Sequence, residues 1–165
     1  MPERINEDSQ IKQGYLYAIR LLAASKKSES ELLKRLLKKG FSEFSALEVI
    51  QKLKQKRILS DQKLVEEAVH WATQTKRYGK RRISMELKRR GIASVEIENA
   101  FKNYDDLLER QTAAQLAQER WQKLNKVEMK KRKTRVYNFL LNRGFDFELV
   151  REILNQLESK TRENI

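Results

Sequence analysis

The 165-residue chain contains no cysteine, one proline and five glycines. The absence of cysteine excludes a disulfide framework and a thiolate metal site. Because the one proline is at position 2, nothing in the interior of the sequence has to break a helix, and the commonest residue types are good helix formers. No stretch alternates apolar and polar residues with β-branched enrichment, as a half-buried strand does. The sequence therefore predicts an all-α fold.

Long apolar runs are also absent. No run approaches the roughly 18 apolar residues of a membrane-spanning helix, and the first ten residues, MPERINEDSQ, lack the apolar stretch of a secretory signal. We therefore expect a soluble, cytoplasmic protein.

Residues that carry chemistry are scarce. The single histidine, His70, forms Glu-x-x-His with Glu67, but the second copy that a di-iron bundle requires is missing, so we interpret His70 as a solvated or capping residue. There is no glycine-rich phosphate loop. We expect no enzymatic activity, no metal site and no cofactor.

What the chain does contain is a repeat centred on a glycine. The segments 32–53, 82–104 and 135–157 align on Gly40, Gly91 and Gly144, which lie 51 and 53 residues apart. A basic residue precedes each glycine and an apolar residue follows it. The apolar residues four positions before the glycines are Leu36, Leu87 and Leu140. Glycine adopts the left-handed conformation that often ends a helix, so each repeat predicts a helix, a tight glycine turn and a second helix.

A further amphipathic helix precedes each pair, which gives three tandem three-helix repeats. Their expected bounds are 10–57, 58–106 and 107–159, with flexible ends at 1–9 and 160–165. A module of about 50 residues has a marginal core by itself, so we expect neighbouring modules to lean on one another in an elongated array. Trp71 and Trp121 occupy comparable places in the second and third modules, and we interpret both as core residues.

Positive charge is in large excess, with 36 Lys and Arg against 23 Asp and Glu and a formal net charge of +13. Such an excess indicates an anionic partner, namely nucleic acid, a membrane surface or an acidic protein. Basic residues gather away from the apolar stripe at the same position of the second and third modules, which favours phosphate contact over a plain solvated face. The predicted nucleic-acid-binding residues are Lys76, Arg77, Lys80, Arg81, Arg82, Lys88, Arg89, Arg90, Lys126, Lys130, Lys131 and Arg135.

Two tyrosines lie close to these basic residues. Tyr104 occupies a repeated core position, and we interpret it as a core residue. Tyr78 lies in an expected loop, where stacking on a base and a structural role are equally open.

The order of short motifs along the chain is more specific than any one of them. Tyr17-Ala18 and Leu21-Leu22 are followed by Ser28-x-x-Glu31-Leu32, Lys39-Gly40-Phe41, Leu59-x-Asp61, Ala68 with Trp71, Tyr78-Gly79, Ile83, Glu86-Leu87 and Arg90-Gly91-Ile92. In this order they resemble the RecX family, bacterial regulators of the RecA recombinase. Lys80 stands where that family usually has proline, and Gln62 stands where a second acid is common.

The resemblance implies a curved rod of three-helix repeats that lodges along the groove of the RecA–DNA filament. It implies modulation of the recombinase, usually inhibition, in DNA repair, DNA recombination and the SOS response. The expected DNA partner is the single strand within the filament, and the protein is expected to be a monomer that binds no membrane.

The residues themselves indicate only a basic helical protein, so two alternatives stay open. One is a stand-alone DNA- or RNA-binding protein. The other is a membrane-surface protein with basic amphipathic helices, for which the segment 80–90 lacks the usual Trp or Phe.

Overall fold

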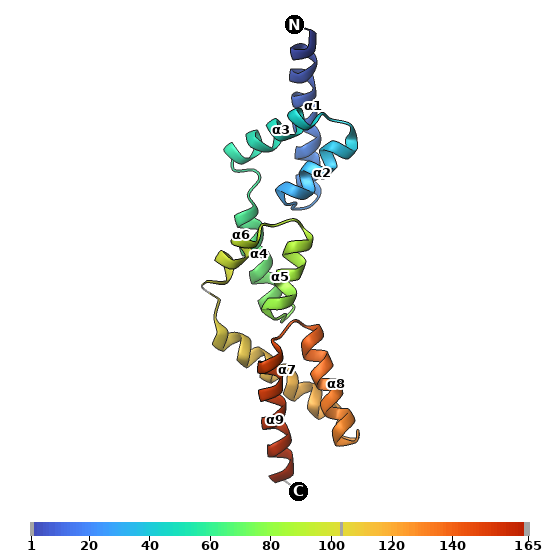
Figure 1. The fold of residues 1–165 in the computed structure, drawn as a ribbon, viewed down its shortest axis with the longest axis vertical. Helices are drawn as coiled ribbons and strands as arrows, with labels where there is room; N and C mark the ends of the chain where they lie inside the picture. Colours follow the sequence, from blue (N-terminus) through green and yellow to red (C-terminus); the bar gives the residue numbers. More distant parts are fainter. Residues whose placement is uncertain (1, 103, 164–165) are drawn as a thin grey trace. The chain divides into compact units, whose positions relative to one another are not determined.

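The computed structural model describes residues 2–102 and 104–163, and within these ranges it contains nine α-helices and no strand (Figure 1). Their bounds are α1 Pro2–Ala24, α2 Glu29–Lys39, α3 Glu43–Gln55, α4 Asp61–Gln74, α5 Lys80–Arg89, α6 Ser94–Phe101, α7 Asp106–Lys123, α8 Met129–Asn142 and α9 Phe147–Glu163. The all-α class and the succession of three-helix repeats are therefore confirmed.

The repeated glycines form the turns that the sequence predicts. Gly40, Gly91 and Gly144 have φ angles of 100°, 79° and 86°. In each turn the N–H of the residue after the glycine donates to a carbonyl five residues earlier, with N···O distances of 3.2 to 3.3 Å. This pattern is a Schellman motif. The accepting residues are Leu36, Leu87 and Leu140, whose side chains are at most 2% exposed.

The contacts of the chain define two compact units. The first extends to Glu67 and also includes Leu87–Glu98, and the second comprises Ala68–Glu86 and the chain from Asn99 onward. Helices α4, α5 and α6 each contribute residues to both units. The expected module bounds, and the elongated, curved array, stay predictions.

Each unit has a core of apolar side chains from three helices. In the first unit, α1, α2 and α3 pack around Leu32, Leu36 and Leu53, which are fully buried. In the second unit, α7, α8 and α9 pack around Val136 and Leu140, which are also fully buried.

The interpretation of Trp71 as a core residue is wrong, whereas that of Trp121 is confirmed. Trp121 is 3% exposed, and its indole N–H donates to Thr161 Oγ1 at 3.2 Å, near the end of the 17-residue helix α9. The corresponding helix of the middle repeat, α6, has only eight residues. Trp71 is 51% exposed, and its ring faces the ammonium group of Lys76, 5.0 Å from the ring centroid.

The ends of the chain are helical where the structure describes them. Helix α1 begins at Pro2 and α9 ends at Glu163, so helices include most of the residues expected as flexible ends. Proline suits a first turn because its missing N–H has no helical partner there. Residues 1, 164 and 165 lie outside the described residues, and fraying of the terminal turns stays a prediction.

Candidate nucleic-acid interface

In the first unit the start of α2 is bound by the Arg90–Gly91 turn. Arg90 donates from Nε and Nη2 to the two carboxylate oxygens of Glu31, at 3.1 Å and 3.0 Å. Its Nη2 also donates to the carbonyl of Lys26 at 2.9 Å. Ser28 Oγ donates to the carbonyl of Arg90 at 2.5 Å. Ser28 and Glu31 also form the capping box of α2, so one motif both starts a helix and binds the glycine turn of the next repeat.

Helix α4 completes this set of contacts, which we call the first joint. The carboxylate of Asp61 accepts the N–H of Glu29 at 2.8 Å, and Glu67 forms an ion pair with Lys26. Asp61 is 7% exposed. Burial raises the pKa of Asp61 to about 6, with a further contribution from the carboxylates of Glu29 and Glu96, and the Glu29 N–H opposes the shift only in part.

The second unit contains a corresponding set of contacts one repeat later, which we call the second joint. It lacks a counterpart of the Arg90–Glu31 pair among the described residues, because Arg82 stands at the position equivalent to Glu31. Arg143, which precedes Gly144, donates to the carbonyl of Lys76 at 2.6 Å, as Arg90 does to that of Lys26. The N–H of Gly79 donates to the carbonyl of Arg143 at 2.9 Å, in the role that Ser28 Oγ has in the first joint.

The remaining contacts of the second joint also have counterparts in the first. Arg77 donates to both carboxylate oxygens of Glu119 at 3.0 Å and 3.4 Å, corresponding to the pair of Lys26 with Glu67. The N–H of Lys80 donates to the carboxylate of Glu109 at 2.8 Å, corresponding to the bond from Glu29 to Asp61. Burial raises the pKa of Glu109 as well. The joint is therefore a repeated structural unit.

Several of the predicted phosphate-binding residues belong to these joints. The side chains of Arg77 and Arg90 are engaged as described, and the ammonium of Lys80 forms an ion pair with Asp106. Arg82 donates to the carbonyl of Asn142 at 3.1 Å and to Glu86 at 3.2 Å. These cations are therefore bonded to groups within the protein itself.

The other eight predicted residues have exposed side chains. The ammonium of Lys76 lies 5.0 Å from the ring centroid of Trp71. Lys131 lies 3.8 Å from Glu128, a long and exposed pair. Six more have no hydrogen-bond or ion-pair partner for their side chains among the described residues: Arg81, Lys88, Arg89, Lys126, Lys130 and Arg135. They lie on α5, on α8 and immediately before α8.

The two tyrosines of the basic region are engaged within the second unit. Tyr78 is half-buried, with the guanidinium groups of Arg82 and Arg143 at 3.9 Å and 5.8 Å from its ring centroid. These contacts favour a structural role over base stacking. Tyr104 is half-buried and packs edge-to-face on Phe101 at 5.2 Å, so it is partly covered but is not one of the fully buried core residues.

Arg132 is a structural cation that the sequence interpretation did not single out. It is 8% exposed and donates from Nε and Nη2 to the carbonyl of Trp121, at 2.9 Å and 2.6 Å. Burial lowers its pKa. A signal was present, because Arg132 lies four residues before Val136 and so continues the buried stripe of α8.

Groups of side chains suited to metal binding do not occur in the described part of the chain, where no three His, Cys, Asp or Glu residues gather. His70 is exposed. Among the described residues, no helix is long and apolar enough to cross a membrane.

Comparison with known proteins identifies the family to which the three repeats belong. Models of the first, second and third three-helix domains of RecX match residues 15–58, 60–100 and 108–154. A protein named Regulatory protein RecX from Pelodictyon phaeoclathratiforme is 30% identical over 141 residues, which cover 86% of each chain. The chain belongs to the RecX family. The RecX protein of Chlorobium phaeobacteroides is 31% identical, covering 91% of this chain and 97% of its own.

Solved structures of RecX proteins share the fold. The crystal structure of RecX from Lactobacillus salivarius matches with a TM-score of 0.82 at 22% identity, covering 92% of this chain and 98% of that one. A second crystal structure of a regulatory protein RecX matches with a TM-score of 0.80 at 20% identity, covering 93% and 75% of the two chains.

Lys80 contributes to the second joint through both its backbone and its side chain. Its N–H donates to Glu109, a bond that the proline expected from the family resemblance could not make. Its ammonium also lies 4.8 Å from the ring centroid of Tyr104.

Proposed function

We propose that this RecX protein binds filaments of the RecA recombinase on single-stranded DNA and inhibits the recombinase without chemistry of its own. This activity would serve DNA repair, DNA recombination and the SOS response. The protein would act as a cytoplasmic monomer that needs no cofactor.

The observation that carries the proposal is the division of the cations into two sets. The first set, represented by Arg82 and Arg90, is bonded to carbonyls and carboxylates within the protein. The second set, represented by Arg81 and Lys130, is exposed and has no partner among the described residues. Side chains of the second set can reach phosphates without breaking an existing pair.

The second set belongs to a chain whose net charge is +13, so the protein as a whole also attracts nucleic acid. Cations that neutralise phosphates release condensed counterions, which gives sequence-independent affinity for nucleic acid. A filament presents both phosphates and recombinase subunits. Two linked contacts raise the overall affinity by a factor of about 10² to 10⁴ when the geometry allows both.

The test is a paired titration of the protein against RecA filaments, held with a non-hydrolysable nucleotide, and against the same single strand alone at matched salt. We expect tighter binding to the filament. ATP hydrolysis by RecA, followed in parallel with ATP, should fall at protein concentrations well below those that saturate the bare strand.

A second candidate function is that of a stand-alone nucleic-acid-binding protein, which the net charge of +13 also favours. It requires no contact with the recombinase. Equal affinities for filament and bare strand, with hydrolysis lost only when the bare strand is saturated, would support it and overturn the regulator proposal.

A further inference from the structure

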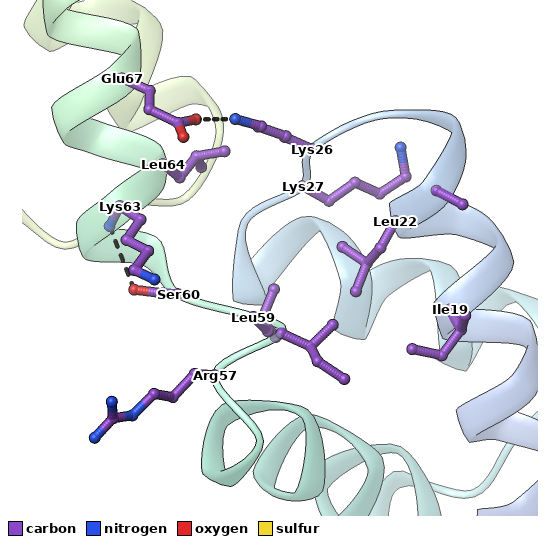
Figure 2. Close-up of a pocket in the computed structure, with 12 residues that line it drawn as sticks. Ile19, Leu22, Lys26, Lys27, Arg57, Leu59, Ser60, Lys63, Leu64 and Glu67 are labelled. Atoms are coloured by element: carbon purple, nitrogen blue, oxygen red, sulfur yellow. Dashed lines mark hydrogen bonds and ion pairs between the residues drawn. The ribbon is translucent and has the colours of Figure 1, made fainter.

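The first unit contains a pocket of about 420 Å³ between the end of α1, the α3–α4 connection and the first turns of α4 (Figure 2). The walls are aliphatic and comprise Ile19, Leu22, Ile58, Leu59 and Leu64, together with the methyl group of Ala23. Four cations stand at the rim, namely Lys26, Lys27, Arg57 and Lys63. Glu67 is the one acid among the lining residues, and it is paired with Lys26.

A much smaller pocket, of about 30 Å³, lies at the corresponding elements of the second unit, between the end of α4, the α6–α7 connection and the first turns of α7. Aromatic side chains of Tyr78, Tyr104 and Phe145 line that position. The pocket of the first unit is thus lined by aliphatic side chains, whereas the smaller pocket of the second unit is lined in part by aromatic ones.

Arg57 at the rim has a strained backbone. Its φ angle is 57°. The N–H of Arg57 donates to the carbonyl of Lys54, and the N–H of Ile58 donates to that of Leu53, both at 2.9 Å. This is again a Schellman motif, in which Arg57 occupies the position where glycine is free of steric cost. Strained residues of this kind cluster at ligand clamps.

We propose that this pocket binds an acidic peptide segment of a protein partner, with one large apolar side chain inserted between Ile19, Leu22 and Ile58. The carboxylates that flank the inserted side chain would lie against Arg57 and Lys63. The side chains of Arg57 and Lys63 have no partner among the described residues, so they can bind carboxylates without losing an existing contact.

The lining favours a peptide over nucleic acid. None of the lining side chains is aromatic, so a base would find no ring on which to stack. Ligand pockets of a few hundred Å³ are typically apolar with a small number of polar groups that fix the orientation, as here. This site goes beyond the proposed function and does not depend on it. The proposed function rests on exposed cations of α5 and α8, and none of those residues lines the pocket.

The test uses a fluorescein-labelled peptide of Glu and Asp residues around one central Phe, and a matched peptide with Ser in place of Phe. We expect the Phe peptide to bind about tenfold or more tightly than the Ser peptide, because only the former buries a ring. Arg57→Gly should weaken binding about two- to fivefold. This variant removes the cation and relieves the strained φ angle, so it should be at least as stable as the parent protein.

Two further variants locate the site. Ile58→Ser changes a side chain that is 46% exposed and should abolish the preference for the Phe peptide. The matched controls are Leu47→Ser, 49% exposed and outside the pocket, and Lys52→Ala, which removes one charge elsewhere on α3. Neither control should alter the preference for Phe or match the effect of Arg57→Gly.

The opposite results would overturn the proposal. Equal binding of the two peptides would show charge attraction alone. Unchanged binding by Arg57→Gly would place the peptide elsewhere, even if Ile58→Ser proved too unstable to assay. Displacement of the Phe peptide by oligothymidylate, with oligothymidylate affinity that itself depends on Arg57 and Ile58, would identify a nucleic-acid site instead.

Discussion

Arg90 and Glu31 lie 59 residues apart in the chain and are joined by two hydrogen bonds, 3.1 Å and 3.0 Å long. Burial opposes the ionisation of Glu31, but the hydrogen bonds from Arg90 and from the N–H of Ser28 outweigh it and lower the pKa of that carboxyl. Glu31 is thus kept ionised as the carboxylate partner of the Arg90 guanidinium. A cation that the sequence presents as part of a basic surface serves here to bind one repeat to the next.

The first prediction concerns this pair. Arg90→Lys should lower the free energy of unfolding by about 1 to 2 kcal/mol, because an ammonium group cannot reproduce the two-pronged contact and the bond to the Lys26 carbonyl. The control is Arg89→Lys at the neighbouring position, where the side chain is exposed and unpaired. Urea unfolding measures the free energy of unfolding of both variants. Equal values would contradict a structural role for Arg90.

The second prediction is a ranking of the three repeated glycines. A Cβ atom at Gly40 would meet no atom within 4 Å, so Gly40→Ala should cost only the strain of its φ angle, about 1 to 2 kcal/mol. At Gly91 the new atom would overlap the Oγ and the Cβ of Ser30, of which only the Oγ can rotate aside. At Gly144 it would overlap the backbone N of Arg82, which cannot.

Alanine should therefore destabilise the protein in the order Gly40, then Gly91, then Gly144. Melting temperatures of the three variants test the order. Equal effects at all three positions would mean that only the left-handed φ matters and that the close approach of the repeats contributes nothing.

The glycine turns and their leucines could be read from the sequence because a Schellman motif is local and its residues lie within six positions. The joints could not. The pairs Arg90–Glu31 and Arg77–Glu119 span 59 and 42 residues, and nothing in the basic run distinguishes a cation that has a distant carboxylate from one that has none.

The burial of Trp71 also could not be predicted from local sequence. Its spacing on α4 matches that of Trp121 on α7, but burial depends on the length of a later helix, which is 8 residues for α6 and 17 for α9. Arg132 is the converse case, because its spacing of four from Val136 marks a buried position that its charge conceals.

The third prediction concerns Asp61, whose pKa in the folded protein is raised to about 6 by burial and by the carboxylates of Glu29 and Glu96. A raised carboxyl pKa means that the folded state holds the proton more tightly than the unfolded chain does. Stability from this group is therefore fully present below the usual pKa of aspartate, near 4, and is lost as the pH rises to about 6.

Asp61→Asn should remove this dependence, since its amide oxygen can still accept the N–H of Glu29. At pH 7.5 the variant should be more stable than the parent by about 1 to 3 kcal/mol, and the difference should shrink towards pH 4. Unfolding curves across this range provide the test, with Glu98→Gln, at an exposed position, as the control. A constant difference at every pH would show that the carboxyl of Asp61 does not titrate in this range.

The last prediction separates the exposed cations from those of the joints by two independent measurements. Replacing Arg81, Lys88 and Arg89 with Ala should leave the melting temperature nearly unchanged, because these side chains have no partner among the described residues. The same variant should bind single-stranded DNA with a weaker salt dependence. Each phosphate contact contributes about −0.7 to the slope of log K against log salt on a single strand, so the slope should become shallower by about 2.

A variant with the same loss of charge on α2, Lys34→Ala with Arg35→Ala and Lys38→Ala, controls for net charge, since those side chains are also exposed and unpaired among the described residues. Arg77→Ala should give the reverse result, a lower melting temperature with the slope retained, because its guanidinium is already bonded to Glu119. If the α2 control changed the slope equally, the weaker salt dependence would come from the lower net charge and not from lost contacts of Arg81, Lys88 and Arg89. A slope unchanged in the first variant would show that its three cations are only solvated and would leave the cations around α8 to make the phosphate contacts.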